Sequence, residues 1–210
     1  MLPSPDEMTA RLLVLLFGFT WHELAHNAMA AFLGDPTPAR DGRLTLNPIR
    51  YLDPVGSLML LLTGFGWSRS GPLDPLAMRK AGSPRKAMAL VALAGPLANF
   101  LLGTLAAALL RFIPMSERLM LIVGFVSYLE IQLAFFNLIP IPPLDGATIL
   151  EGIVAPPVAD FIEGLRPYGS LIFIAAFFVL PYLGFDLFFA LIDEATRAFW
   201  LFLILLFSLF

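Results

Sequence analysis

The chain has 210 residues, of which 59% are apolar and 14% are charged, and its formal net charge is −3. A soluble domain usually has about 45–50% apolar and about 25% charged residues, so this composition argues against a soluble fold and indicates a membrane protein. The sequence has no cysteine and no basic tract, which excludes disulfides, thiolate ligands and a cysteine nucleophile, and we expect no nucleic-acid partner.

Apolar segments separated by proline, glycine and charged residues predict the elements of the fold. A helix needs about 20 residues to cross a bilayer, and the candidate spans in chain order are residues 9–33, 87–112, 119–139, 167–183 and 187–210. Residues 55–66 are apolar but too few to cross as a helix, so we expect a re-entrant or interfacial piece there. The predicted fold class is therefore an all-α membrane protein, a polytopic bundle of about five to six transmembrane helices with a short re-entrant segment.

Positive charge is concentrated between the first and second spans. Eight of the 13 Lys and Arg residues fall between positions 40 and 86, and by the positive-inside rule this stretch faces the cytoplasm. The first span and the third span, residues 119–139, then both run toward the cytoplasm. The proline-rich residues 140–166 are expected to form a loop on that same side.

The first span contains the sequence His-Glu-Leu-Ala-His at residues 22–26. His22 and His26 are four residues apart, so on a helix they project from one face and can share a metal ion. Glu23 lies beside them and can take a proton from a metal-bound water. These are the only histidines of the chain, and ionisable groups at membrane depth are costly and usually functional. The alternative is a pair of hydrogen-bonded structural histidines.

A catalytic zinc site normally has three protein ligands and a water. Since the chain has no further His and no Cys, the third ligand must be a carboxylate. Asp145 follows the third span directly, and three prolines before it can unwind the helix end and turn the carboxylate inward. Both inward-running spans then bring their ligands to the same depth, although a plain turn residue before Gly146 is the alternative. The acidic candidates on the predicted cytoplasmic side are Asp41, Asp53, Asp74, Asp145, Glu151 and Glu163.

Three segments in this order resemble the signature segments of the site-2 protease family, which are intramembrane zinc metalloproteases. They are residues 22–26, residues 95–99 (Gly-Pro-Leu-Ala-Asn) and residues 137–146 (Asn-Leu-Ile-Pro-Ile-Pro-Pro-Leu-Asp-Gly). Residues 42–56 also resemble the family segment after the first core helix. The chain is most similar to compact bacterial members without PDZ or CBS domains.

The resemblance implies a role for each matching residue. His22, His26 and Asp145 are expected to bind one zinc ion, and Glu23 is expected to be the general base. Ligand type alone would also permit cobalt, but availability favours zinc.

Asn99 and Asn137 match two asparagines of the family segments, and the resemblance implies that they hold the substrate strand or the oxyanion. The alternative is that both are packing amides that hydrogen-bond between spans. The chain departs from the family at Tyr51, where many relatives have histidine, and after Gly146, where it has Ala147 and Thr148. Residues 66–72 match the usual Gly-Trp-Ala-Lys-Pro segment only loosely. None of these departures touches an expected ligand.

The expected function is hydrolysis of peptide bonds in or near transmembrane segments of membrane proteins, in a bacterial cell membrane. Residues 1–210 are expected to form one domain, with the catalytic spans in residues 9–150, accessory spans in residues 151–210 and the active site toward the cytoplasm. Residues 43–66 are a candidate for pairing with an extended substrate, or a plain lipid-facing loop. A divalent-cation transporter and an inactive membrane scaffold are the alternative functions.

Overall fold

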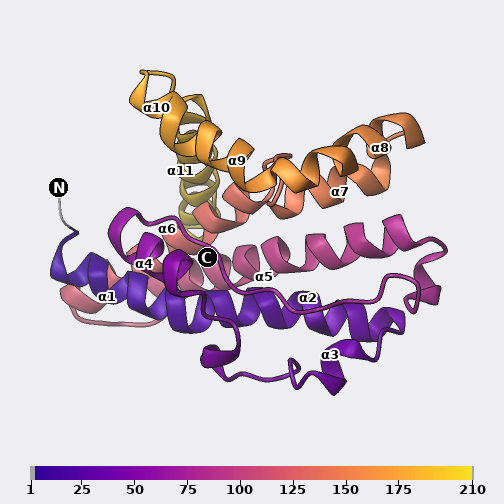
Figure 1. Ribbon diagram of the computed structural model, residues 1–210. Coiled ribbons are helices and arrows are strands. Elements are labelled where there is room, and N and C mark those ends of the chain that lie inside the picture. The colour runs from indigo at the N-terminus through magenta and orange to yellow at the C-terminus, as the bar shows by residue number, and fades with distance from the viewer. Residues whose placement is uncertain (1–2, 210) are drawn as a thin grey trace.

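The computed structural model describes residues 3–209, and the regular secondary structure of this part of the chain is helical (Figure 1). Within it, the one β-type pairing is an isolated antiparallel bridge between Leu52 and Ser68. The predicted all-α class is therefore confirmed.

The first long helix carries the His-Glu-x-x-His motif. It consists of α1 (Pro5–Leu13), one π-helical turn (Val14–Gly18) and α2 (Phe19–Leu33), and the backbone stays helical across both joins. Gly34 ends it in the left-handed conformation, with φ of 118°, which glycine adopts without steric cost.

A short helix and an extended loop follow. The helix α3 (Thr37–Arg40) is one turn, and α4 (Pro54–Thr63) has ten residues. At 1.5 Å per residue α4 spans about 15 Å, half of the hydrocarbon core of a bilayer, as a re-entrant segment requires. After α4 the chain runs back beside residues 51–52, where the N–H of Arg69 donates to the carbonyl of Tyr51 at 2.6 Å.

Two long helices form the centre of the molecule. α5 (Pro84–Phe112) and α6 (Glu117–Asn137) make the most extensive helix pair, and α5 also contacts α2, α7 and α11. Gly103 of α5 lies so close to α6 that a Cβ there would sit 2.7 Å from the side chain of Ile131. Small residues that permit such close approach are common between membrane helices.

The C-terminal third differs from the prediction. Residues 140–166, expected as a loop, contain α7 (Asp145–Ile153) and α8 (Pro156–Leu165). The prolines do not break α8 because they occupy its first positions, where no backbone N–H is needed. Helical structure then continues through α9 (Gly169–Ile174) and a π turn to α10 (Leu180–Tyr182), so this helical segment begins at Pro156 and not near residue 167.

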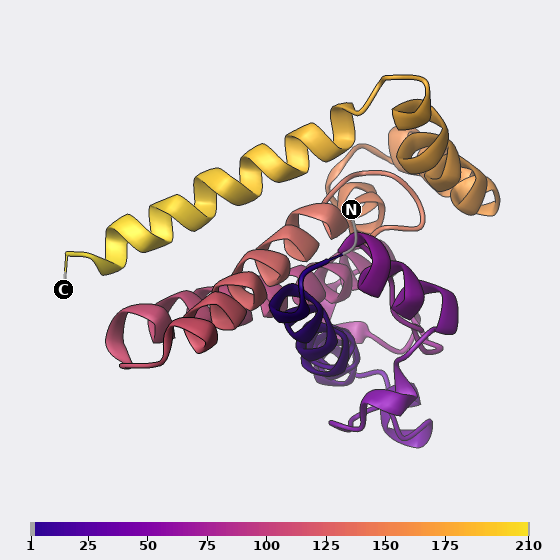
Figure 2. The same ribbon diagram turned by 90° about the vertical axis from the view of Figure 1, so that its left-hand side faces the viewer.

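The last helix, α11 (Leu187–Phe207), is unbroken despite its charged residues. Asp193 accepts a hydrogen bond from the hydroxyl of Tyr128 on α6 at 2.6 Å, and Glu194 pairs with Arg197 within the helix. Figure 2 shows α11 running along α6 at the edge of the molecule.

Three helical segments of the described chain are long and apolar enough to cross a membrane: Pro84–Phe112, Glu117–Asn137 and Pro156–Tyr182. This is fewer than the five to six spans predicted. The motif helix, residues 5–33, and α11 are also long, but each carries several polar or charged side chains within its apolar sequence.

Candidate active site

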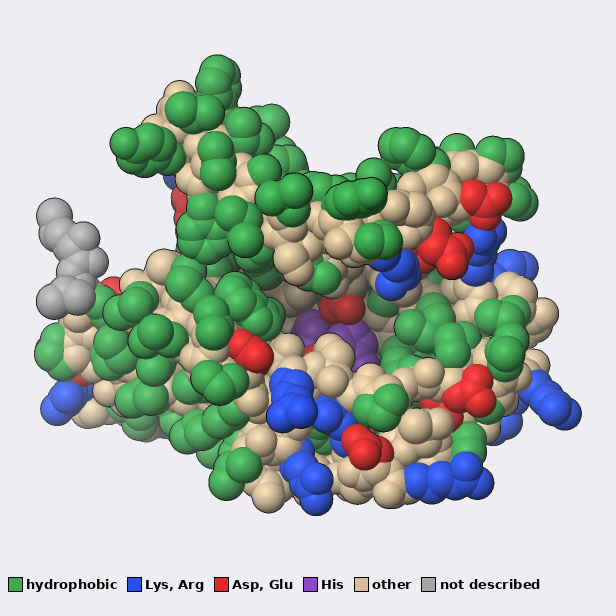
Figure 3. All heavy atoms as spheres, in the orientation of Figure 1, with side chains coloured by type: hydrophobic (Ala, Val, Ile, Leu, Met, Phe, Trp, Pro, Cys, Tyr) green, Lys and Arg blue, Asp and Glu red, His purple; other side chains and the backbone are tan. Residues whose placement is uncertain are grey.

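A cavity of about 220 Å³ opens at the motif helix. Its walls come from α2, the loop of residues 66–70, α5, α6 and the turn before α7. In Figure 3 the histidine atoms lie at the bottom of a hollow between the arm of α7 to α9 and the rest of the molecule. The motif is therefore reachable from outside the protein.

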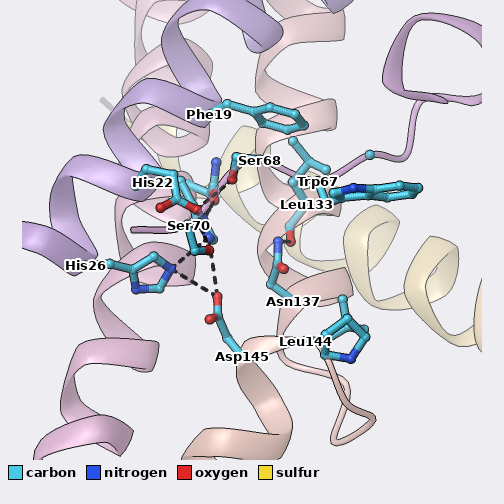
Figure 4. Close-up of a pocket in the computed structure, with 14 residues that line it drawn as sticks. Phe19, His22, His26, Trp67, Ser68, Ser70, Leu133, Asn137, Leu144 and Asp145 are labelled. Atoms are coloured by element: carbon cyan, nitrogen blue, oxygen red, sulfur yellow. Dashed lines mark hydrogen bonds and ion pairs between the residues drawn. The ribbon is translucent and has the colours of Figure 1, made fainter. Parts of the chain in front are cut away.

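The two histidines and Asp145 converge on one point (Figure 4). The Nε2 atoms of His22 and His26 are 2.9 Å apart, and Asp145 Oδ2 lies 3.3 Å from each of them. Asp145 is the first residue of α7, so the prolines before it do bring the carboxylate back toward α2. The predicted juxtaposition is present in the structure.

The far side of each imidazole is hydrogen-bonded. His22 Nδ1 lies 2.6 Å from the side-chain oxygen of Asn99, and His26 Nδ1 lies 2.7 Å from the carbonyl oxygen of Val91. An oxygen of either kind only accepts, so each Nδ1 carries the hydrogen. When both rings are neutral, each Nε2 then carries a lone pair, and both Nε2 atoms lie beside Asp145. Such outer contacts are typical of histidines that bind metals.

The donor set fits a divalent cation. Asp145 Oδ2 is buried and has no hydrogen-bond partner among the described residues. An ionised oxygen and two nitrogen lone pairs that face one another repel, and a cation between them removes that repulsion. Nitrogen and oxygen donors of this kind are typical zinc ligands.

Glu23 has a different environment from Asp145. A carboxylate oxygen of Glu23 also lies within 4.8 Å of ligand atoms of both histidines. However, Glu23 Oε1 already accepts hydrogen bonds from the hydroxyls of Ser68 at 2.7 Å and Ser70 at 3.3 Å. Asp145 is thus the carboxylate whose oxygen facing the histidines has no hydrogen-bond partner, and Glu23 is the one held beside the site by two hydroxyls.

The other acidic candidates lie elsewhere. Asp53 caps the N-terminus of α4, and the backbone N–H of Asp74 donates to Asp35. The remaining three form ion pairs with arginines: Asp41 with Arg43, Glu151 with Arg166, and Glu163 with Arg85. Of the six carboxylates, Asp145 is the one beside the histidines.

Gly95 on α5 makes room for the imidazoles. A Cβ at this position would lie 2.3 Å from His26 Nε2 and 2.7 Å from His22 Cε1. Any side chain here would displace the rings. The Gly-Pro-x-x-Asn segment is visible in the sequence, but the steric role of its glycine is not.

The two asparagines have unequal positions. Asn99 is buried, and both ends of its amide are engaged, with His22 on one side and Glu130 on the other. Asn137 lines the cavity, and its amide donates to the carbonyl of Leu133 at 2.9 Å. Their expected roles toward substrate or oxyanion stay predictions.

Tyr51 anchors the loop that covers the site. Its ring is fully buried, and its hydroxyl donates to the carbonyl of Arg43 at 2.5 Å and lies 2.9 Å from that of Thr45. Burial raises the pKa of this hydroxyl, so it stays protonated and remains a donor. Arg43 in turn donates to the carbonyl of Arg69 at 2.9 Å, which fixes the serine-containing loop.

Ser68, Ser70 and Glu130 also belong to the site or contact it, and they were not among the predicted site residues. The serines could have been suspected because they lie in the segment that departs from the family pattern. The signal for Glu130 was a lone carboxylate in an otherwise apolar span.

Comparison with known proteins identifies the family. Residues 114–176 match the model of Peptidase family M50. The chain is 38% identical over 175 residues to "Putative zinc metalloprotease YwhC" of Bacillus subtilis, which covers 79% of this chain and 78% of the relative. This chain belongs to peptidase family M50. The resemblance to site-2 proteases inferred from the motifs is confirmed.

Other relatives match over a similar length. "Putative zinc metalloprotease Rip2" of Mycolicibacterium smegmatis is 29% identical, covering 81% of this chain and 71% of the relative. Rip2 of Mycobacterium tuberculosis is 32% identical, covering 78% of this chain and 64% of the relative. No solved structure matches the chain significantly.

Proposed function

We propose that this chain is an intramembrane zinc endopeptidase that hydrolyses peptide bonds in or near the transmembrane segments of other proteins. Membership of family M50 makes it a zinc metalloprotease, and its long apolar helices make it a membrane protein. One observation carries the finer proposal. Two histidine nitrogens and an unpartnered carboxylate oxygen converge at 2.9–3.3 Å beside a second, hydrogen-bonded carboxylate.

His22, His26 and Asp145 would hold one zinc ion in this proposal. When bound, zinc would supply Lewis acidity, acidifying a water molecule and polarising the scissile carbonyl. The Nδ1 contacts of both rings orient the Nε2 lone pairs before the ion arrives, which lowers the cost of assembling the site.

Glu23 would move the protons. It would take one proton from the attacking water and deliver it to the leaving amine. The hydroxyls of Ser68 and Ser70 hold one of its oxygens, which leaves the other oxygen for the water. This division explains why one carboxylate of the site has hydroxyl partners while Asp145 Oδ2 has no hydrogen-bond partner.

Asn137 is the asparagine better placed to contact the substrate. It lines the cavity, and its amide nitrogen has one hydrogen beyond the bond to Leu133. We propose that the Asn137 amide donates a hydrogen bond to the oxyanion or to the substrate backbone. Asn99 also lines the cavity, but it is buried and its amide is held at both ends, by His22 and by Glu130.

An apolar crevice of about 580 Å³ lies beside the cavity between α4 and α9. It shares Trp67, Pro143 and Leu144 with the cavity, and otherwise consists mainly of apolar side chains. Such a crevice suits an apolar substrate segment that arrives from lipid. Residues 43–66 would pair with the unwound strand, and the cavity would open toward the cytoplasm, where the basic residues 40–86 lie. Residues 1–210 would act as one protease domain.

The test is the substitution Glu23→Gln, assayed in detergent or liposomes with a labelled membrane peptide. We expect zinc content to be retained and cleavage to be abolished, since the amide cannot take a proton. Asp145→Ala should lose both zinc and cleavage. Glu163→Gln, which changes an exposed carboxylate paired with Arg85, is the matched control and should retain both. Unchanged cleavage in Glu23→Gln would remove Glu23 as the base.

A further inference from the structure

A further buried carboxyl group lies behind the site and has no part in the mechanism above. Glu130 sits within the apolar helix α6 and is 2% exposed. An ionisable side chain at such a position is costly and calls for a function. Among the described residues it has no cationic partner, and its only side-chain hydrogen bond is with Asn99.

The neighbouring helices are shaped around Glu130. A Cβ on Gly18, at the end of the π turn, would lie 2.2 Å from Glu130 Oε1. A Cβ on Gly103 of α5 would lie 3.3 Å from the Cβ of Glu130. Two glycines from two different helices therefore leave the volume that this side chain fills.

A chain of two hydrogen bonds links Glu130 to His22. Asn99 donates from Nδ2 to Glu130 Oε2 at 2.5 Å, and its Oδ1 lies 2.6 Å from His22 Nδ1. All three side chains are buried. The bonds thus run from α6 through α5 to the motif helix.

We propose that Glu130 is a positioning residue that sets the tautomer of His22 through Asn99. Glu130 Oε2 accepts from the amino end of the Asn99 amide, as an oxygen of an ionised carboxylate or the carbonyl oxygen of a carboxylic acid can do. The carbonyl end must then face His22, which places the hydrogen on Nδ1 and leaves Nε2 free to bind a metal. Without this acceptor the amide can rotate by half a turn and favour the tautomer with hydrogen on Nε2.

His26 provides the internal contrast. Its Nδ1 faces the backbone carbonyl of Val91, which belongs to α5 and cannot reverse its polarity. His26 therefore needs no further support, whereas the amide partner of His22 has two possible orientations. A purely structural link between α5 and α6 would leave both tautomers unaffected by changes at Glu130.

The test uses the fact that the chain has two histidines. Protein labelled with ¹⁵N-histidine and stripped of metal gives signals from two rings, recorded in detergent at a pH where both are neutral. We expect His22 to be the Nδ1–H tautomer in the wild type and a mixture in Glu130→Leu. His26 should not change. The zinc affinity of Glu130→Leu, measured by competition with a chelator, should fall about 10- to 100-fold.

A rescue experiment separates positioning from packing. Asn99→Asp alone places two carboxylates in contact and should weaken zinc binding strongly. In the double variant Asn99→Asp/Glu130→Gln, residue 99 still accepts from His22 while the amide of residue 130 donates to it. We expect this pair to restore the Nδ1–H tautomer and most of the zinc affinity. The double variant also preserves side-chain volume, so it tests the positioning role even if Glu130→Leu does not fold.

Ser127→Ala is the matched control, because Ser127 is also buried on α6 and bonds to α5, through the carbonyl of Gly103. It should leave both readouts unchanged. An unaltered His22 tautomer in Glu130→Leu overturns the proposal, whatever the zinc affinity of that variant, as does a failed rescue in a folded double variant. The effect on affinity rests on the proposed metal site, but the tautomer is read without metal. A wild type that holds zinc and cleaves no peptide would refute the proposed function alone.

Discussion

His22 and Glu23 are adjacent in the chain, yet different parts of the molecule hold their side chains. His22 is supported from behind by Asn99 and Glu130, which belong to the two central helices. Glu23 is supported from the front by Ser68 and Ser70, which belong to a loop without regular structure. The groups that would hold a metal are thus attached to the most extensively packed pair of helices. The group that would move protons is attached to a segment that can rearrange at lower cost.

The largest effect should come from filling the space behind the imidazoles. Gly95→Ala places a methyl group 2.3 Å from His26 Nε2, so the ring must leave its position. We expect zinc affinity to fall at least about 100-fold, more than for loss of an outer hydrogen bond, with loss of cleavage. Gly164→Ala is the control, since a Cβ there meets nothing within 4 Å. Normal zinc affinity in Gly95→Ala would mean that the rings can be held in another way.

An intermediate effect is expected on the glutamate side. The double change Ser68→Ala/Ser70→Ala removes both hydroxyl donors to Glu23. A hydrogen bond to a charged group is worth about 1.5–3 kcal/mol, so kcat/KM should fall about tenfold or more. Zinc affinity should change little, because neither serine bonds to a ligand.

Ser57→Ala is the control for the serine variant, because the Ser57 hydroxyl is buried without a partner among the described residues. Kinetic measurements and zinc titration on the same preparations would check the comparison. A parallel loss of zinc affinity and activity in the serine variant would show that His22 and Glu23 are not held in place independently.

The smallest effect concerns the loop that follows the motif helix. Asp35 is buried and accepts from the backbone N–H groups of Thr37 at 2.8 Å and Asp74 at 2.7 Å. Burial alone would raise its pKa, but these hydrogen bonds lower it below 3.8. Its contribution to stability is therefore present above the unfolded-state pKa and is lost as the pH falls through the lower folded-state pKa.

Asp35→Asn should consequently lower the free energy of unfolding by about 1 kcal/mol at pH 7. The deficit should shrink as the pH falls below 3.8, the ordinary pKa of this group, and through the lower folded-state pKa. Thermal unfolding in detergent at pH 7 and across this acidic range measures this. A deficit that stays constant between the two would exclude the ionised carboxylate as its source.

Much of the site was predictable because its signals are local. Helical geometry alone predicts that His22 and His26 share one face of a helix. The number of spans and the position of the positive charges predict that Asp145 lies on the same side of the membrane as the two histidines. The helix α8 is not predictable from proline content, because prolines at the first turn of a helix are compatible with it.

The outer contacts of the site were not predictable in the same way. The bond between Asn99 and Glu130 joins residues 31 positions apart, and those of the serines with Glu23 join residues 45 and 47 apart. Periodicity indicates which face of a helix is buried but not which residue of a neighbour lies opposite. The steric need for Gly95 likewise appears only once two helices are placed side by side.

The π turn at Val14–Gly18 has a consequence for the register of the motif helix. Buried positions recur every four residues on both sides of it, as at Ala10, Val14, Gly18, His22 and His26. On a helix of 3.6 residues per turn, an interval of four drifts by about 40° each time, so the first and last of these would face nearly opposite directions. The wider turn takes up about one extra residue and cancels much of this drift. One continuous helix can thereby keep its N-terminal half against α6 and still direct both imidazoles into the cavity.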